Sequence, residues 1–303
     1  MNTDLLMEVS GLSKITKKEK SARYVRQFES IFACPICQSP MKVSELKSLI
    51  CSNNHAFDFT RQGYVNLLTH PPKTKYSKDL FEARKTIIAN DGLFDPLTEK
   101  IAEFLKQTNA VTILDTGCGE GSHLVNICDQ IRSDEMKPVT GTGIDIAKEG
   151  IFTAAKNYPG MIWTVADLAN TPFQDNQFDV ILNILSPSNY TEFNRLLKPD
   201  GYVMKVVPQS GYLKELREAF FDETDKQSYS NAETVDLFEE HFQMIDRLNV
   251  QYTKELGALS IPSLMKMTPL TWTISEEKVQ SFIDNNTNQI TVDLEILIGK
   301  RLV

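Results

Sequence analysis

Four side chains that can bind a metal ion lie in two pairs within a short stretch of the chain. Cys34 and Cys37 are separated by two residues; thirteen residues later, Cys51 and His55 are separated by three. Two such pairs are typical of a tetrahedral zinc site, in which each pair holds the ion from a tight turn. Because protein ligands would fill all four positions, we predict a structural zinc ion. A chance pair of cysteines in a reduced protein is the alternative interpretation.

A second group of residues has the spacing of a nucleotide-binding loop. The apolar stretch VTIL is followed by Asp115, Gly117, Gly119 and Gly121, and then by a segment with helical character. Glycines at such a turn let a ligand approach the backbone at the helix N-terminus. Dinucleotide dehydrogenases share this geometry. The acid ahead of the glycines suits a cationic ligand, such as a sulfonium amino acid, better than a pyrophosphate.

Two further acids end the next two predicted strands. Asp145 ends the stretch TGTGID, where a carboxylate is placed to bind a ribose diol. Asp167 ends the stretch MIWTVAD, where it is placed to receive an adenine amino group. For each acid alone, a residue that ends a strand or caps a helix is the alternative. Together, three acids at successive strand ends predict S-adenosyl-L-methionine as the cofactor.

Alternating strands and helices must position these acids. From residue 111 onward, strand-like stretches of six to eight residues alternate with helical ones. This pattern predicts an α/β fold with a doubly wound, Rossmann-like sheet, preceded by a small zinc-binding module. Together with the predicted cofactor, it indicates a sheet of the class I methyltransferase type. Two stretches of period 2 near the C-terminus predict an antiparallel pair at the sheet edge. Residues 79–107 predict two helices that are divided at residues 90–92.

Charge is distributed unevenly along the chain. The net charge is −8, but residues 1–90 carry 14 Lys and Arg against 8 Asp and Glu. Because phosphate attraction acts over roughly a Debye length of about 8–10 Å, this local excess matters more than the total. It is consistent with a nucleic-acid partner, and a solvated basic surface is the alternative. The basic residues include Lys14, Lys17, Lys18, Lys20, Arg23, Arg26, Lys73, Lys75, Lys78, Arg84 and Lys85.

These patterns divide the chain into four expected parts. They are a basic N-terminal extension over residues 1–30, a zinc-binding RNA-recognition module over 31–70, a linker with helices over 71–110, and the methyltransferase domain over 111–303. The chain has neither a stretch of about 18 apolar residues nor the pattern of a secretory signal. We therefore expect a cytoplasmic protein with reduced cysteines.

Several of these motifs together resemble the bacterial 23S rRNA (guanine-N1)-methyltransferase family, of the large-subunit methyltransferase A type. The resemblance runs from about residue 32 to the C-terminus. It rests on the stretches FACPICQSP, CSNNHAFDFTRQGYVNLL, ILDTGCGEGSHL, GIDIAKEGIFTAAKNYP, LLKPDGYVMKVVP and LMKMTPLTW. The spacing of the cysteines and histidine ahead of GYVNLL is the most specific of these features.

The resemblance implies site residues and a partner. It implies zinc on the cysteine and histidine cluster, and cofactor contacts from the glycine loop and from His123 and Leu124. Two further cofactor contacts would fall on Phe94 and Tyr212, where relatives can have tyrosine and histidine. The implied substrate is a hairpin loop of 23S rRNA, and a homodimer that cradles the hairpin is consistent with the resemblance.

Methylation at guanine N1 requires an unpaired base and a route for the N1 proton. The target pocket is expected beside the end of the fourth strand, across the sheet crevice from the cofactor. Asn183, Ser186 and Pro187 are the candidate catalytic residues there, with Tyr190 and Trp272 as candidate aromatic contacts. For each, a turn residue or a core residue is the alternative. No general base stands out.

Two other functions compete with this interpretation. A small-molecule methyltransferase would use the zinc module only as a lid. A non-catalytic RNA-binding protein would retain the cofactor fold without transferring a methyl group, and the intact acid-glycine loop argues against it. Methyl transfer to RNA that disappears on ribonuclease treatment would separate the leading interpretation from both.

Overall fold

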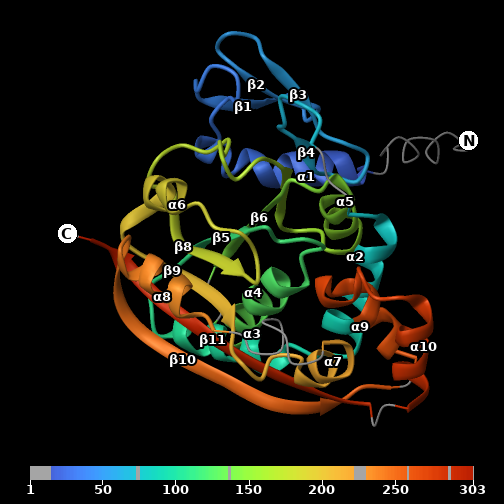
Figure 1. The fold of residues 1–303 in the computed structure, drawn as a ribbon. Coiled ribbons are helices and arrows are strands. Elements are labelled where there is room, and N and C mark those ends of the chain that lie inside the picture. The colour runs from blue at the N-terminus through green and yellow to red at the C-terminus, as the bar shows by residue number, and fades with distance from the viewer. Residues whose placement is uncertain are drawn as a thin grey trace, which may run out of the picture.

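A computed structural model describes residues 15–72, 76–135, 138–221, 230–257, 259–285 and 288–302. A sheet of eight strands forms its centre, and a smaller sheet of three strands sits above it (Figure 1). In spatial order, the strands of the large sheet are β10 (Phe242–Glu255), β11 (Gln289–Arg301), β9 (Leu197–Pro208), β8 (Phe178–Ile184), β5 (Thr112–Thr116), β6 (Thr140–Asp145), β7 (Ile162–Val165) and β4 (Val65–Asn66).

The large sheet has the predicted doubly wound arrangement. From β4 to β9 each neighbouring pair is parallel, and the chain order reverses between β5 and β8. At the other edge, β11 is antiparallel to both β9 and β10. The predictions of an α/β fold and of an antiparallel pair at the sheet edge are therefore confirmed. Reversal of strand order opens a crevice at the carboxyl ends of β5 and β8, where such folds bind ligands.

Alternating side chains of the strands divide the core into two layers. Ile113 and Leu182 belong to one layer, and their neighbours Leu114 and Ile181 belong to the other. On the first face lie α3 (Asp95–Lys106), α4 (Ser122–Glu135), α5 (Lys148–Asn157) and α7 (Lys214–Phe220). On the second face lie α1 (Lys17–Arg26), α6 (Tyr190–Leu196), α8 (Ala232–Glu239) and the segment that holds the metal-binding residues.

Helix α1 belongs to the second core layer. Thr16 and Glu19 form a capping box that starts the helix, with each side chain bonded to the other residue's backbone N–H. Ala22 and Val25 are buried in the core layer that the large sheet shares with the segment that holds the metal-binding residues. We call that segment, with its three-stranded sheet, the small domain. Part of the basic segment over residues 1–30 therefore packs against the fold. Lys14, Lys73 and Lys75, which were among the predicted basic residues, lie outside the described residues.

The small sheet is joined closely to the large one. It consists of β1 (Met41–Ser44), β2 (Ser48–Cys51) and β3 (Ala56–Asp58), preceded by the short helix η1 (Glu29–Ile31). The chain then enters the large sheet, because β4 pairs in parallel with β7. The Phe32 and Phe173 rings lie 5.5 Å apart across the junction. The pairing of β4 with β7 and a shared core fix the orientation of this small domain on the large sheet.

Two groups of helices border the carboxyl end of the sheet. The predicted pair over residues 79–107 is present as α2 (Lys78–Lys85), which continues into a π-helical turn, η2 (Thr86–Asn90), and then α3. Its break falls at Gly92, which has a positive φ of 61°. The second group connects β10 to β11 and consists of α9 (Ile261–Met267), η3 (Pro269–Thr271) and α10 (Glu276–Asn285). Among the described helices, none has the length and apolar character of a membrane span.

Candidate functional site

The four predicted metal ligands converge on one point. The ligand atoms of Cys34, Cys37, Cys51 and His55 all lie within 4.8 Å of one another. His55 Nδ1 is 3.5 Å from the Sγ atoms of both Cys34 and Cys51, and the Sγ atoms of Cys37 and Cys51 are 3.7 Å apart. Zn–S and Zn–N bonds of about 2.3 and 2.0–2.1 Å in a tetrahedron require separations of about 3.5–3.8 Å. These residues therefore fit a tetrahedral zinc ion.

Two tight turns create this geometry. The amide of Gln38 donates to the carbonyl of Cys34, and the amide of Asn54 donates to that of Cys51. Both Gln38 and Asn54 have a φ of 61°, which folds each turn back on its cysteine. Hydrogen bonding with the side chain and backbone of Ser39 lowers the pKa of Cys37 to about 5, which favours the thiolate that binds metal.

A cavity of about 630 Å³ lies at the crevice between the carboxyl ends of β5, β6 and β8. Its size suits a cofactor together with part of a substrate. Nine of the predicted site residues line it: Phe94, Gly117, Gly119, His123, Asp145, Asp167, Ser186, Pro187 and Tyr212. Four others, Asp115, Gly121, Leu124 and Asn183, are buried behind its wall.

The glycine loop has the conformation that the sequence suggests. Gly117 and Gly119 have φ values of 74° and 58°, a region in which other residues are strained. A Cβ atom on Gly117 would lie 1.9 Å from Oγ of Ser186, so the loop touches the turn after β8. Asp145 orients the loop, because its carboxylate accepts from the amides of Gly119 at 2.8 Å and Ala147 at 2.7 Å.

Several buried acidic side chains lie around the glycine loop, and their pKa values are raised. Burial raises the pKa of Asp115 to about 7, and the nearby carboxylate of Asp145 adds to the effect. Burial likewise raises the pKa of Glu120. Arg84 of α2 opposes both shifts, and its guanidinium packs 3.6 Å from the Cβ position of Gly119. A positive sulfonium and ammonium would relieve the repulsion among the acids.

Three buried polar atoms beside the loop have no hydrogen-bond partner among the described residues: Nε of Arg84, Oε1 of Glu120 and Nδ1 of His123. Buried polar groups are normally paired, and Arg84 and His123 line the cavity, so the unpaired atoms of these two side chains fit a polar ligand. The residues present match S-adenosylmethionine, which carries a carboxylate for Arg84 and two positive groups for the acids. His123 stays neutral there, because burial lowers its pKa to about 3. Its ring meets that of Phe94 at 5.4 Å.

Lys205 is a cavity residue that the sequence interpretation missed. It lies in the middle of β9, is 5% exposed, and donates to Oδ1 of Asn183 at 2.7 Å. Asn183 in turn donates to the carbonyl of Pro187 at 2.9 Å and to Oγ1 of Thr116 at 3.1 Å. Among the described residues, the side-chain amide of Asn183 therefore forms hydrogen bonds only within the cavity wall, through both its oxygen and its nitrogen. A lysine inside the apolar stretch GYVMKVVP was the signal available, since lysine is rarely buried without a role.

Aromatic residues form the outer rim of the cavity. Tyr76 and Trp272 line it, are 44% and 48% exposed, and have ring centroids 6.1 Å apart. Trp272 thus lies where a pocket-lining aromatic was expected. Tyr190 does not line the cavity, because it is buried among Phe193, Phe238 and Phe242.

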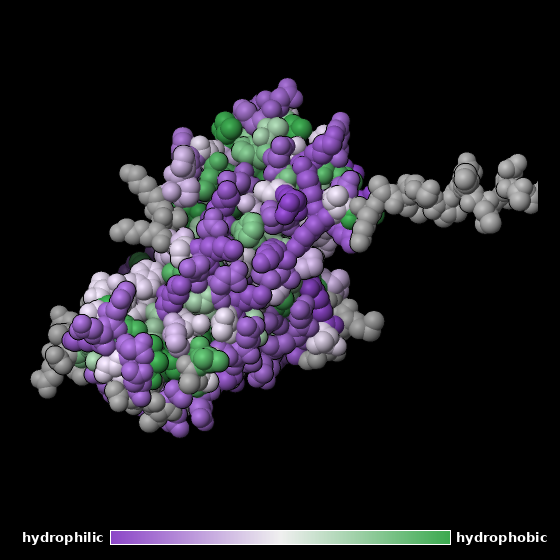
Figure 2. Space-filling model, turned by 90° about the vertical axis from the view of Figure 1, so that its right-hand side faces the viewer, coloured by the Kyte–Doolittle hydropathy of each residue, from purple (hydrophilic) through white to green (hydrophobic). Residues whose placement is uncertain are grey.

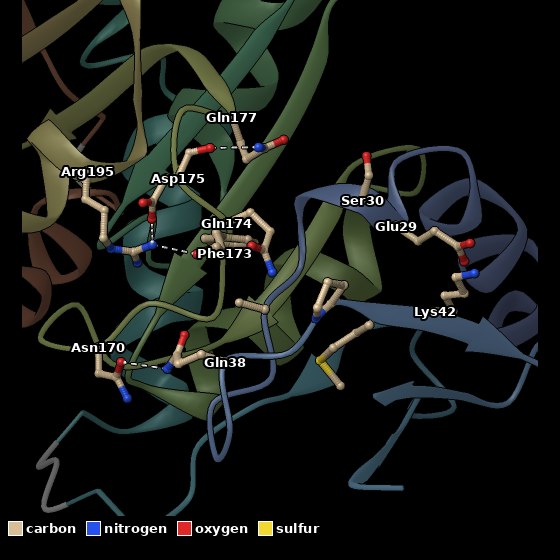
Figure 3. A pocket seen from close by; sticks show the side chains of 13 residues that line it. Glu29, Ser30, Gln38, Lys42, Asn170, Phe173, Gln174, Asp175, Gln177 and Arg195 are labelled. Carbon is tan, nitrogen blue, oxygen red and sulfur yellow. Dashed lines mark hydrogen bonds and ion pairs between the residues drawn. The ribbon is translucent and has the colours of Figure 1, made fainter. Parts of the chain in front are cut away.

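A second cavity, of about 820 Å³, lies between the small domain and the large sheet (Figure 3). Its polar side chains bind one another: Arg195 donates to Asp175 at 2.9 Å and to the carbonyl of Phe173, and Gln38 donates to Asn170. Residues 174–177 precede β8, so this cavity faces the amino end of that strand. Since ligands of such sheets bind at the carboxyl ends, the first cavity is the candidate site.

Comparison with known proteins finds relatives that share both features. The family described as "RlmA, N-terminal" matches residues 32–78, and "Methyltransferase domain" matches residues 113–201. A Bacillus subtilis (strain 168) protein named "Putative 23S rRNA (guanine-N(1)-)-methyltransferase YxjB" is 46% identical over 277 residues, covering 90% of this chain and 98% of that protein. The Streptomyces fradiae "23S rRNA (guanine(748)-N(1))-methyltransferase" is 28% identical, covering 84% and 88%. The two family matches include the four metal ligands and the glycine loop.

Proposed function

Because this chain belongs to the 23S rRNA (guanine-N1)-methyltransferase family, we propose that it transfers the methyl group of S-adenosyl-L-methionine to N1 of a guanine in 23S rRNA. The observation that carries the proposal is that one chain combines four residues that fit a zinc ion with a cofactor cavity, and that β4 joins the zinc-binding segment to the large sheet. When bound, the cofactor supplies an activated methyl group on a sulfonium. Binding the cofactor, positioning the target base and accepting its proton depend on side chains of the protein.

Cofactor binding is assigned to the inner end of the cavity. We propose that Asp145 binds the ribose diol and Asp167 the adenine amino group, since Asp145 ends β6 and Asp167 lies just after β7, and both line this cavity. Arg84 would pair with the carboxylate of the methionine part, and Asp115 would balance its positive groups from behind. The loop glycines with His123 and Leu124, and the rings of Phe94 and Tyr212, would complete the binding site.

The outer end of the cavity is assigned to the target base. An unpaired guanine from a hairpin loop exposes its N1 edge, which a paired guanine does not. Tyr76 and Trp272 offer aromatic faces at the cavity entrance on which a base can stack. Ser186 and Pro187 lie deeper, on the turn after β8 that touches the glycine loop. Asn183 would hold this turn through its bond to the Pro187 carbonyl.

RNA binding is assigned to α1 and to the zinc-binding domain. Lys20, Arg23 and Arg26 are exposed on α1 beside that domain. Hydrophilic residues cover most of the face seen in Figure 2, and hydrophobic ones appear at its upper end, where the small domain lies, and at its lower left. Arg84 was predicted as part of the basic surface, but it lines the cofactor cavity instead. A homodimer around one hairpin is a further proposal, which sedimentation with and without RNA would test.

Primer extension on 23S rRNA tests the proposed function. N1 methylation blocks base pairing, so reverse transcriptase should stop at one nucleotide when RNA from cells lacking the protein is treated with protein and cofactor. A ribonuclease-treated sample with tritiated cofactor should lose all labelled product. Labelling that survives ribonuclease would instead support a small-molecule methyltransferase, and no labelling of rRNA would contradict the proposal. An Asp145→Ala variant serves as the cofactor-binding control.

A further inference from the structure

Lys205 is a buried lysine without a carboxylate partner among the described residues. Its ammonium donates to Oδ1 of Asn183 at 2.7 Å, Oγ of Ser188 at 3.2 Å and the carbonyl of Ser186 at 3.4 Å. All three acceptors are neutral and lie at the carboxyl end of β8 or in the turn that follows it. Lys205 also lines the cavity beside Ser186 and Pro187, on the side assigned to the target base.

Burial lowers the pKa of Lys205 to about 8, since a charged ammonium loses hydration there and no negative charge replaces it. The ionisable groups considered on β11 and α6 supply no free negative charge for Lys205. Glu295 of β11 pairs with Arg247 at 2.7 Å. On α6, burial raises the pKa of Tyr190, so that side chain stays a neutral phenol near neutral pH. Lys205 is therefore about one-tenth free amine at pH 7 and about half free amine at pH 8.

Other titratable side chains that line the cavity are poorly suited to accept a proton from the base. Arginine side chains such as Arg84 and Arg217 do not release a proton in proteins, so they have no free lone pair. Burial lowers the pKa of His123 to about 3 and raises that of Tyr212 to about 12. Asp145 is bonded to two backbone amides. Asp167 is exposed and accepts from the amide of Ala169 at 2.8 Å.

We propose that Lys205 is the general base that accepts the N1 proton of the target guanine. The inference rests on the proposed function. The N1 electron pair forms a bond to the methyl carbon while the S–CH₃ bond breaks, and its electrons stay on sulfur as a thioether. The N1–H proton moves to the neutral amine of Lys205, which becomes an ammonium and later releases the proton to water. Charge is conserved, because the positive charge of the sulfonium ends on the lysine.

Hydrogen bonding around Lys205 is compatible with both states. The ammonium has three hydrogens, and its three acceptors match them. The neutral amine keeps two hydrogens and gains a lone pair. The bond to the Ser186 carbonyl is the longest of the three, so its loss frees one position on nitrogen at the least cost. Asn183 holds the amine in place through the shortest bond, which makes Asn183 a positioning residue.

The test compares single-turnover methyl transfer to a 23S rRNA transcript from pH 6 to 9 by wild-type protein and by Lys205→Met. In wild-type protein, the rate should rise with pH and level above about pH 8. In Lys205→Met, the rate should fall about 10²–10⁴-fold and keep rising with pH without levelling. Lys198→Met is the matched control, because Lys198 lies on the same strand and pairs with Asp179 outside the cavity; its rate should match wild type.

Chemical rescue separates a proton acceptor from a structural lysine. Ethylamine added to Lys205→Ala should restore part of the rate in proportion to its free-base concentration, while cofactor affinity measured by calorimetry stays unchanged. A Lys205→Met rate within about threefold of wild type would overturn the proposal. A loss of rate in Lys205→Ala without rescue would also overturn it. Wild-type protein that methylates no rRNA would overturn the proposed function and, with it, this role of Lys205.

Discussion

Asp115 should destabilise the cofactor-free protein, and replacing it by asparagine should reveal by how much. This carboxyl group is 2% exposed, and burial raises its pKa from the ordinary 3.8 to about 7. In the unfolded chain the same group is in water. Between these two pH values the folded protein binds a proton that the unfolded chain has released, so stability falls as pH rises through this window.

The size of the effect follows from the shift in pKa. A difference of about three pKa units corresponds to about 4 kcal/mol of lost stability above pH 7, at about 1.4 kcal/mol per unit. Asparagine has nearly the same shape and cannot ionise. We therefore expect the stability of Asp115→Asn, relative to wild type, to increase by about 3 kcal/mol between pH 5 and 8. The same variant should bind S-adenosylmethionine more weakly, because a negative charge beside the cationic ligand is gone.

Urea unfolding without cofactor at pH 5, 6, 7 and 8 measures this difference. Asp129→Asn is the control, since Asp129 lies exposed on α4 and pairs only at the surface with Arg132. Its stability relative to wild type should change by less than about 0.5 kcal/mol over the same range. A difference for Asp115→Asn that does not vary with pH would refute the reasoning, because it would mean that the buried carboxyl titrates as it does in water.

Three further predictions concern the cavity and the zinc site. Arg84→Met should weaken S-adenosylmethionine binding about 10–100-fold in calorimetry, as expected for a lost charged hydrogen bond. The control Lys85→Met should bind the cofactor normally, because Lys85 bonds Asn157 outside the cavity. Equal affinities of the two variants would exclude the pairing of Arg84 with the cofactor carboxylate. Trp272→Ala should lower kcat/KM for rRNA about 10-fold or more with unchanged cofactor affinity, and an unaltered kcat/KM would remove Trp272 from base stacking. Cys51→Ser should lose bound zinc in elemental analysis and lose RNA binding in a filter assay; a variant that keeps tight RNA binding without zinc would contradict the assignment of RNA recognition to this domain.

Local spacing was enough to predict the chemistry of both binding features. Two metal-binding pairs need only short turns to meet, so the positions of Cys34, Cys37, Cys51 and His55 in the chain already implied their convergence. The same holds for the glycine loop and for Asp145, because the ends of parallel strands meet at one edge of a sheet. The alternation of strands and helices likewise predicted a doubly wound sheet.

Contacts between distant segments were decided only by the tertiary structure. In the sequence, Arg84 is one of several basic residues of a predicted helix. In the structure, α2 packs over the glycine loop, so Arg84 lines the cavity. Lys205 acquires its lowered pKa from burial between β8, β9 and the turn at Ser186. Tyr190 is placed in the core by α8 and β10, more than forty residues away. Desolvation and the proximity of charges depend on what surrounds a side chain in space. The zinc site and the cofactor loop could therefore be predicted from the sequence, whereas the roles of Arg84 and Lys205 in the cavity could not.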